Sequence, residues 1–498
     1  MRATRIALIL LLAVFMLPGT LRAQKRGPDV EVRMLNGRPT IYIGGKPDAL
    51  PGYSPGTTKE YYDKYMHLFY AHKMGVYPIW IDGWGVSESS RWWSGDKVSD
   101  TPFFEHPSTV FTLDDQARHI MKGDPDAWII VRFYTRAPKS WADLHPNEFA
   151  INEEGTVQTT PSLASDAFWE KAAEFSAALV RYCEKQPWGS RVIGYNTHYL
   201  EEGTHMPSAD GWQFDHNPLM VKKYRDFLRK KYGDVKKLRA SWGDSTLTFE
   251  TAAVPKDRLR GSVPDVSSLL YWQNARDNQP LRDYLELTRD LFHLRFRQAG
   301  GAMAKAADRK VLILHDALKQ VMPGWNLKGF FGYPSFGGTV SWSLAYPELL
   351  AGSGHMDAAR LFDAVGFDGI LTPHDYQARG IGGVYLPEGM ADSAVLRGKY
   401  FWGEMDTRSG DKDIGTARNY REWASITWRN YATGWTRGYN SYWMYGFYIA
   451  DWFGDKPVQD VIQRQTEIVR ESIGWSHETV PGIAMILDDT SVLETNGS

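Results

Sequence analysis

The residues with the clearest potential for chemistry are glutamates that follow β-like runs of the sequence. "YLEEG" holds the adjacent pair Glu201 and Glu202, and "WGEMD" holds Glu404. Two carboxyl groups on opposite sides of a pocket can hydrolyse a glycosidic bond, because one protonates the leaving oxygen while the other attacks the anomeric carbon. The alternative is structural: each glutamate would cap a helix or pair with an arginine such as Arg132 or Arg408. That alternative explains one glutamate alone, whereas glutamates at two strand ends favour catalysis.

Short β-like runs alternate with stretches of helical periodicity along the chain, which is typical of parallel β/α units. The eight runs are "DALPGY" from 48, "GVYPIWID" from 75, "AWIIVRFYT" from 127, "RVIGYNTHYLE" from 191, "KVLILHD" from 310, "FDGILTPHDY" from 367, "KYFWGEMD" from 399 and "GYNSYWMYG" from 438. This alternation predicts an α/β fold, a (β/α)8 or TIM barrel, with a long insertion after the fourth strand over residues 203 to 280. Functional side chains of such barrels lie at the C-terminal strand ends, so the glutamates of the fourth and seventh strands would share one mouth.

A longer stretch around the glutamate pair resembles a known family. "GYNTHYLEEG" followed by "YRDFLRKKYGDVKKLRASWGDSTLTFETAAVP" is similar to the acid/base region of the family 42 β-galactosidases of glycoside hydrolase clan A. There a strand-end glutamate precedes a helix reading roughly F-x-x-W-L-x-x-K-Y-G, then L-N-x-x-W-G and a closing Pro. The resemblance covers most of residues 45 to 490. It implies a retaining, β-galactosidase-like enzyme that hydrolyses β-linked oligo- or polysaccharides with two glutamates and no cofactor or metal.

The resemblance also implies a role for each glutamate. Glu404 on the seventh strand takes the place of the nucleophile, and Glu202 takes that of the acid/base. Glu201 stands where the family has an Asn that contacts the sugar 2-OH, which leaves the sugar specificity open. A register shift of one residue would make Glu201 the acid instead, because successive side chains of a strand face opposite sides. In either case an ionised neighbour favours the protonated form of the acid.

Substrate-binding candidates follow from strand-end positions. Trp443 on the eighth strand resembles the clan's sugar-stacking platform. Arg132 and Tyr376 are expected near Glu404, where the arginine would hold the carboxylate ionised and the tyrosine would donate a hydrogen bond to it. Further candidates to line the pocket are Trp80, Trp84, His198, Tyr199 and His374. Each of these residues could instead belong to the core.

Two other classes of function remain open from the sequence. A metal-dependent barrel hydrolase would use two strand-end pairs, His315 with Asp316 and His374 with Asp375. No HxH or HExxH spacing accompanies these pairs, which disfavours a metal site. A non-catalytic sugar-binding barrel would keep the tryptophans but would tolerate the loss of either carboxylate, and both are present.

The composition favours a neutral partner. The chain has 57 basic and 59 acidic side chains and a formal charge of -2, so no long-range field attracts nucleic acid or anionic lipid. Aromatic residues make up 14% of the chain, including 20 Trp, and their flat rings suit the CH faces of sugars. The expected partner is therefore a carbohydrate, not a nucleic acid or a membrane, and a homo-oligomer is possible.

The two ends of the chain predict export and a further domain. Residues 1–23 read as a signal peptide, because Arg2 and Arg5 precede the apolar run "IALILLLAVFMLPG" and a short polar stretch ends near Ala23. We therefore expect a secreted or periplasmic protein with its barrel over residues 24–475. Residues 476–498 contain "GIAMILDD", which looks like the first strand of the second, flavodoxin-like domain of the resembled family.

Overall fold

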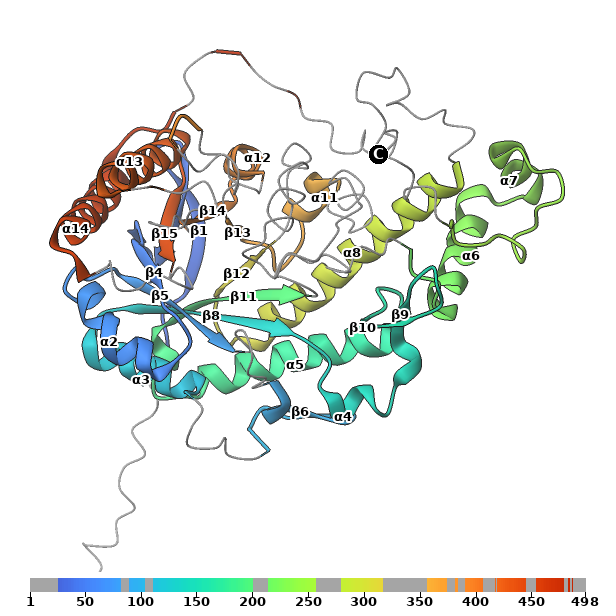
Figure 1. Cartoon of the computed structure of the whole chain (residues 1–498), viewed down its shortest axis with the longest axis horizontal. Coiled ribbons are helices and arrows are strands. Elements are labelled where there is room, and N and C mark those ends of the chain that lie inside the picture. The colour runs from blue at the N-terminus through green and yellow to red at the C-terminus, as the bar shows by residue number, and fades with distance from the viewer. Residues whose placement is uncertain are drawn as a thin grey trace, which may run out of the picture.

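Eight parallel strands form a closed barrel at the centre of the protein (Figure 1). The computed structural model describes residues 26–81, 89–103, 111–199, 214–256, 279–316, 356–373, 381–383, 390–405, 417, 419–444, 454–478, 482–483 and 486. In barrel order the strands are β4 (Gly52–Ser54), β5 (Val76–Ile81), β8 (Trp128–Thr135), β11 (Val192–Tyr199), β12 (Leu312–His315), β13 (Gly369–Pro373), β14 (Tyr400–Met405) and β15 (Asn440–Met444). Each strand overlaps one of the predicted runs, so the predicted TIM barrel is confirmed.

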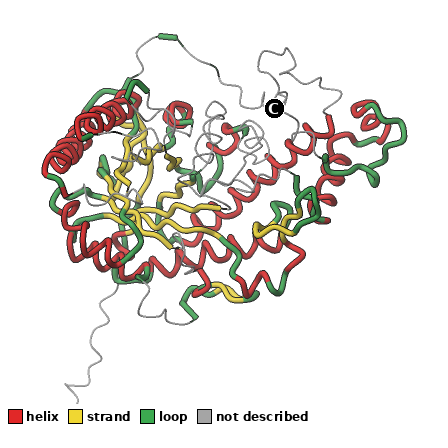
Figure 2. The backbone as a smooth tube through the Cα atoms, viewed as in Figure 1, coloured by secondary structure: helices red, strands yellow, loops and turns green. Residues whose placement is uncertain are grey.

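Helices form an outer layer around the strands of the barrel (Figure 2). The main helices are α2 (Lys59–Tyr70), α3 (Leu113–Gly123), α5 (Asp166–Glu184), α8 (Gln279–Ala306), α11 (Ala358–Phe362), α12 (Ala391–Leu396), α13 (Tyr420–Arg437) and α14 (Lys456–Glu471). Local sequence sets their ends. Thr112 and Asp115 form a capping box that begins α3, and Gly438 in the left-handed conformation, with φ 81°, ends α13.

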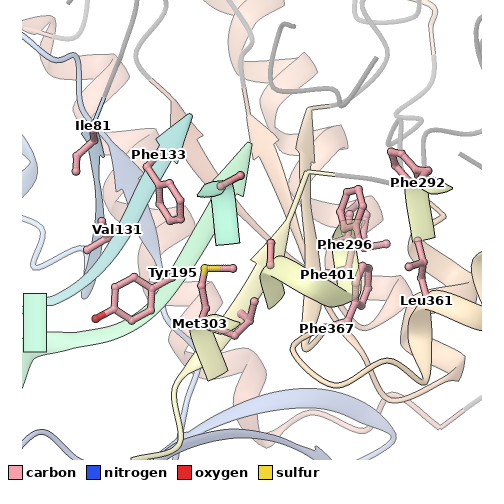
Figure 3. Close-up of a cluster of buried hydrophobic side chains, with 14 of the residues drawn as sticks. Ile81, Val131, Phe133, Tyr195, Phe292, Phe296, Met303, Leu361, Phe367 and Phe401 are labelled. Atoms are coloured by element: carbon pink, nitrogen blue, oxygen red, sulfur yellow. The ribbon is translucent and has the colours of Figure 1, made fainter. Parts of the chain in front are cut away.

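The core between barrel and helices is built from side chains that point out of the strands (Figure 3). Val131 and Phe133 of β8 and Phe401 of β14 are buried in this cluster together with Phe296 and Met303 of α8. Because side chains alternate along a strand, the residues between these positions face the interior of the barrel. The alternation therefore decides which strand residues are available for chemistry.

The interior of the barrel is apolar at the end where the strands begin. Val76, Ile130, Leu312, Tyr400 and Trp402 belong to one buried cluster there. An antiparallel sheet of β1 (Val30–Leu35), β2 (Arg38–Ile43) and β3 (Lys46–Asp48) adds side chains to the same cluster. This sheet, which the sequence prediction did not include, covers the end of the barrel opposite the mouth.

Smaller elements lie in the loops. They are β6 (Trp93–Ser94), β7 (Lys97–Val98), α4 (Lys139–Ala142), β9 (Phe149–Ile151), β10 (Val157–Pro161), α6 (Pro218–Tyr232) and α7 (Val235–Trp242). The last two belong to the predicted insertion and are anchored on α8 by Asp283, which is fully buried. Its Oδ2 accepts hydrogen bonds from Tyr232 Oη and Trp242 Nε1, both at 2.8 Å.

Both ends of the chain fall largely outside the described residues. The predicted signal peptide, residues 1–23, is among them. From residue 476 on, the described residues contain no strand, so the expected flavodoxin-like domain is not shown. Among the residues described, no helix has the length and apolar composition needed to cross a membrane.

One buried arginine joins the N-terminal segment to the barrel. Arg309 donates from Nε and Nη2 to the two carboxylate oxygens of Glu184 on α5, at 2.8 Å each. The same guanidinium donates to the carbonyl oxygen of Pro28 at 2.7 Å and to that of Val192 at the start of β11. Its side chain is fully buried, and Glu184 Oε1 also accepts a hydrogen bond from Tyr195 Oη at 3.0 Å.

We predict that Arg309→Met lowers the free energy of unfolding by about 3–5 kcal/mol, because it removes the buried cation that pairs with Glu184 and the donor to two carbonyl groups. Midpoints of urea unfolding would measure the loss. Lys310→Met is the matched control, since the neighbouring Lys310 pairs with Glu31 at the exposed surface and should matter little. Equal midpoint shifts for the two variants would contradict the prediction.

Candidate active site

A layer of polar side chains lies above the apolar interior, at the C-terminal ends of the strands. It comes from β8, β11, β14 and β15 and from the residue that follows β12. We call it the polar layer, and it consists of Arg132, Asn196, His198, Asp316, Glu404 and Tyr442, each at most 6% exposed. Burying this many polar groups is favourable only if they bind one another, and their contacts show that they do.

Glu404, the predicted nucleophile, lies in the polar layer with two partners. Arg132 Nη1 is 3.3 Å from Glu404 Oε2, and the hydroxyl of Tyr442 donates a hydrogen bond to the same oxygen. Arg132 Nη1 also donates to Tyr442 Oη at 2.9 Å, which closes a triangle. A guanidinium and a hydroxyl donor on one carboxylate oxygen favour its charged form. The predicted contact between Arg132 and Glu404 is therefore present.

The two partners of Glu404 keep their protons. Burial by itself lowers the pKa of the Arg132 guanidinium, but Tyr442, Glu404 and Asp316 act against burial, and the pKa ends above its usual value. Burial raises the pKa of the Tyr442 hydroxyl well above its usual range, and Glu404 adds to this while Arg132 opposes it. Arg132 thus stays a cation and Tyr442 stays a hydrogen-bond donor.

The polar layer continues from Arg132 to β11 and β12. Arg132 Nε donates to Asn196 Oδ1 at 3.0 Å, and Asn196 Nδ2 donates to the carbonyl oxygen of Leu314 at 3.1 Å, which fixes the amide orientation. His198 Nε2 lies 2.7 Å from Asn196 Oδ1, and His198 Nδ1 lies 3.7 Å from Asp316 Oδ2. A continuous set of polar contacts therefore spans the mouth from Asp316 to Glu404.

Trp80 joins the polar layer from the end of β5. Its indole lies over Arg132, whose Cζ is 3.8 Å from the ring centroid, and the ring centroids of Trp80 and His198 are 5.3 Å apart. Three residues predicted to line the pocket, Trp80, Arg132 and His198, are therefore neighbours in the structure.

Trp443 lies elsewhere, which corrects the prediction that it forms the sugar platform. Tyr442 points into the barrel, so its neighbour Trp443 points out of it. The Trp443 ring stacks on Trp423 of α13 with centroids 5.8 Å apart, lies 5.3 Å from Tyr431, and is 1% exposed. It belongs to the core between barrel and helices.

The histidine and the aspartate at the end of the fifth strand, His315 and Asp316, point to opposite sides of the barrel wall. His315 is buried in the helix layer, where its ring stacks on Phe367 with centroids 5.0 Å apart and its Nε2 donates to the carbonyl oxygen of Gly366 at 2.8 Å. Asp316 faces the polar layer instead, so the two side chains lie on opposite sides of the barrel wall, which disfavours the alternative of a shared metal site at this pair. Within the described part of the chain, no three His, Cys, Asp or Glu side chains group as metal ligands.

Several predicted residues lie outside the described part of the structure. They are Glu201, Glu202, Tyr376, Trp84, His374, Asp375 and Arg408, together with the side chain of Tyr199.

Sequence reasoning missed Tyr442 and Asn196. The closeness of Tyr442 to Glu404 follows from the register in which β14 and β15 pair, which the local sequence does not show. Asn196 has the same parity as His198 on β11, so the alternation of side chains would have placed both on one face.

Comparison with known proteins shows a fold shared with glycoside hydrolases. No family model matches the sequence, and no curated protein sequence matches it. Similar solved structures include a β-galactosidase from the haloarchaeon Halorubrum lacusprofundi, with 15% identity, a TM-score of 0.52 and coverage of 84% of this chain and 57% of that one. The catalytic domain of β-amylase from Paenibacillus polymyxa has 13% identity, a TM-score of 0.54 and coverage of 85% and 99%. A β-galactosidase from Bacillus circulans sp. alkalophilus has 12% identity, a TM-score of 0.50 and coverage of 84% and 55%.

These identities establish likeness of fold alone. The chain spans 57% and 55% of the lengths of the two β-galactosidases. The similarity to β-galactosidases expected from the sequence is thereby confirmed for the eight-stranded barrel.

The burial of His315 predicts a stability that falls in acid. Burial lowers the pKa of His315 to about 4, against the opposing effect of its bond to Gly366, whereas an unfolded histidine titrates near 6.5. Between these values only the unfolded state gains a proton. The neutral, buried His315 therefore contributes fully to the free energy of unfolding above pH 6.5. This contribution is lost as the pH falls, and the free energy of unfolding is lower by about 3 kcal/mol at pH 4.

We therefore expect His315→Phe to have a flatter dependence of unfolding free energy on pH between 7 and 4.5 than the unsubstituted protein. Chemical unfolding at a series of pH values measures this slope. His67→Gln, which changes an exposed histidine of α2, should leave the slope unchanged. If His315→Phe has the same slope as the unsubstituted protein, the lowered pKa of His315 is not the source of the acid sensitivity.

Proposed function

We propose that the protein is a secreted retaining β-glycosidase, β-galactosidase-like, that hydrolyses β-linked oligo- or polysaccharides. The observation that carries the proposal is the placement of Glu404 in the barrel mouth with Arg132 and Tyr442 on one of its carboxylate oxygens. The barrel that it shares with solved β-galactosidases supports the same reaction class. The choice of β-galactosides rests on the names of these structures and on the sequence resemblance.

In the proposed mechanism Glu404 is the nucleophile. Its carboxylate attacks the anomeric carbon and forms a covalent glycosyl-enzyme, which water then hydrolyses. Arg132 and Tyr442 orient the carboxylate for the first step. They also stabilise its returning charge in the second step, when the carboxylate becomes the leaving group.

Glu202 is the proposed acid/base. The choice of Glu202 over Glu201 rests on the family pattern Asn-Glu, in which the second residue of the pair is the acid/base. Glu202 would protonate the leaving oxygen and then activate water, while an ionised Glu201 would favour its protonated form. No metal or cofactor has a role in this scheme.

Substitution of the glutamates tests the proposal on two kinds of aryl β-galactoside, one with a poor leaving group that needs acid assistance and one with a good leaving group that does not. We expect Glu404→Ala and Glu202→Ala each to lose about a thousandfold or more in kcat for substrates that need acid assistance. Glu202→Ala should still form the glycosyl-enzyme from a substrate with a good leaving group, and added azide should restore its turnover and yield the β-glycosyl azide. Glu404→Ala should form no intermediate and should yield the α-azide if azide restores any turnover.

Two further variants complete this test. Glu174→Ala changes a surface glutamate that pairs with Lys171 and should retain full activity. If Glu201→Ala shows the azide-restored pattern and Glu202→Ala does not, the roles within the doublet exchange. Full activity in all the Glu201, Glu202 and Glu404 variants would refute the glycosidase proposal.

A further inference from the structure

Trp80 is the accessible part of an otherwise buried group of side chains in the barrel mouth. It is half-buried, whereas Arg132 beneath its ring is 1% exposed and His198 beside it is 2% exposed. Arg132 binds Glu404 as well as supporting Trp80, so the indole lies one side chain away from the proposed nucleophile.

The polar edge of the indole is already used within the protein. Trp80 Nε1 donates a hydrogen bond to Ser54 Oγ at 3.2 Å, and Ser54, at the end of β4, is 1% exposed. What Trp80 offers to the mouth is therefore apolar ring surface. Such a surface binds the CH groups of a sugar ring without requiring further hydrogen bonds.

The backbone of Trp80 is held from outside the barrel by Gln116 of α3. The Trp80 N–H donates to Gln116 Oε1 at 3.0 Å, and Gln116 Nε2 donates to the Trp80 carbonyl oxygen at 2.9 Å. Tyr62 Oη donates to the same Oε1 at 3.3 Å, and Gln116 is 1% exposed. The side-chain amide thus supplies the acceptor and the donor that two residues of a neighbouring parallel strand would offer to Trp80.

A gap in strand pairing explains this arrangement. β4 has only three residues and its register with β5 is the single pair Gly52 and Val76. The edge of β5 that faces β4 therefore has no strand partner at the level of Trp80, although buried backbone groups need hydrogen-bond partners. The side chain of Gln116 supplies these hydrogen bonds and so fixes the backbone position from which the indole projects.

We infer that Trp80 is the sugar-stacking platform of the mouth and that Gln116 is the positioning residue that holds it there. This inference rests on the proposed function, because it assigns the subsite for the sugar that Glu404 attacks. The ligand is the apolar face of a β-galactopyranose ring. Trp443, the residue first expected in this role, belongs to the core instead.

The stereochemistry of the sugar gives the inference a specific consequence. The axial 4-hydroxyl of a galactoside leaves the hydrogens on C3, C4 and C5 on one face, where they form a continuous apolar patch. The equatorial 4-hydroxyl of a glucoside turns the C4 hydrogen to the other face. A stacking platform therefore contributes to the preference for galactosides over glucosides, which a residue that only supports the fold would not do.

The test compares kcat and KM for p-nitrophenyl β-galactopyranoside and β-glucopyranoside. Trp80→Ala should lower kcat/KM for the galactoside about tenfold, mainly through KM, and should lower the galactoside-to-glucoside ratio. Trp80→Phe, which keeps a ring, should retain most of that ratio. Gln116→Leu should change KM and the ratio in the same direction as Trp80→Ala.

The matched control for Gln116→Leu is Gln465→Leu, which removes the amide of a fully buried glutamine on α14 and should leave the ratio unchanged. An unchanged ratio in folded Trp80→Ala, or a ratio that falls equally in Gln465→Leu, overturns the inference while the glycosidase proposal stands. Calorimetric titration with methyl β-galactopyranoside separates the two proposals. Binding that is lost in Trp80→Ala supports the platform even if the protein hydrolyses nothing, and absence of binding and hydrolysis in the unsubstituted protein overturns both.

Discussion

The buried charge of Arg132 is the constraint around which the mouth of this barrel is arranged. A guanidinium at 1% exposure needs anionic and hydrogen-bonding partners to offset the loss of its hydration. Glu404, Tyr442 and Asn196 provide them through hydrogen bonds, and Trp80 adds the face of its ring. Because these partners come from several strands, the one cation fixes their relative positions and holds the carboxylate in place.

The barrel separates this polar group from the rest of the molecule. Below it, apolar interior residues such as Leu312 and Trp402 exclude water, and the N-terminal sheet of β1, β2 and β3 covers their far side. Around it, the helices bury the outward side chains of the strands. A low-dielectric surrounding strengthens the interaction between Arg132 and Glu404, so the fold outside the mouth contributes to its electrostatics.

Much of this architecture could be predicted from the sequence because each barrel strand is a short β-like run between helical stretches. The contact between Arg132 and Glu404 also followed from strand-end positions. The errors at Trp443 and His315 share one cause: both residues were judged by their place along the strand, while the side to which they point was not worked out. Tyr442 and Asp316, their neighbours, face the mouth instead.

The N-terminal sheet was missed although a signal for it was present. Its first turn is Asn36-Gly37, with φ values of 51° and 86°, and this dipeptide is a strong hairpin signal. The positioning role inferred for Gln116 had no such signal, because it depends on where β4 stops pairing with β5. That point is set by the curvature and closure of the whole barrel and not by any local pattern.

The carboxylate held by Arg132 and Tyr442 is the proposed nucleophile of a covalent mechanism. A 2-deoxy-2-fluoro-β-galactoside with a dinitrophenyl leaving group would trap the intermediate, because the fluorine slows both steps while the leaving group still allows the first. Peptide mass spectrometry of the inactivated protein measures where the sugar is attached. We expect one fluorogalactosyl ester, on Glu404. A label on Glu201, Glu202 or Asp316, or turnover of the β-galactoside without any labelled peptide, would contradict this expectation.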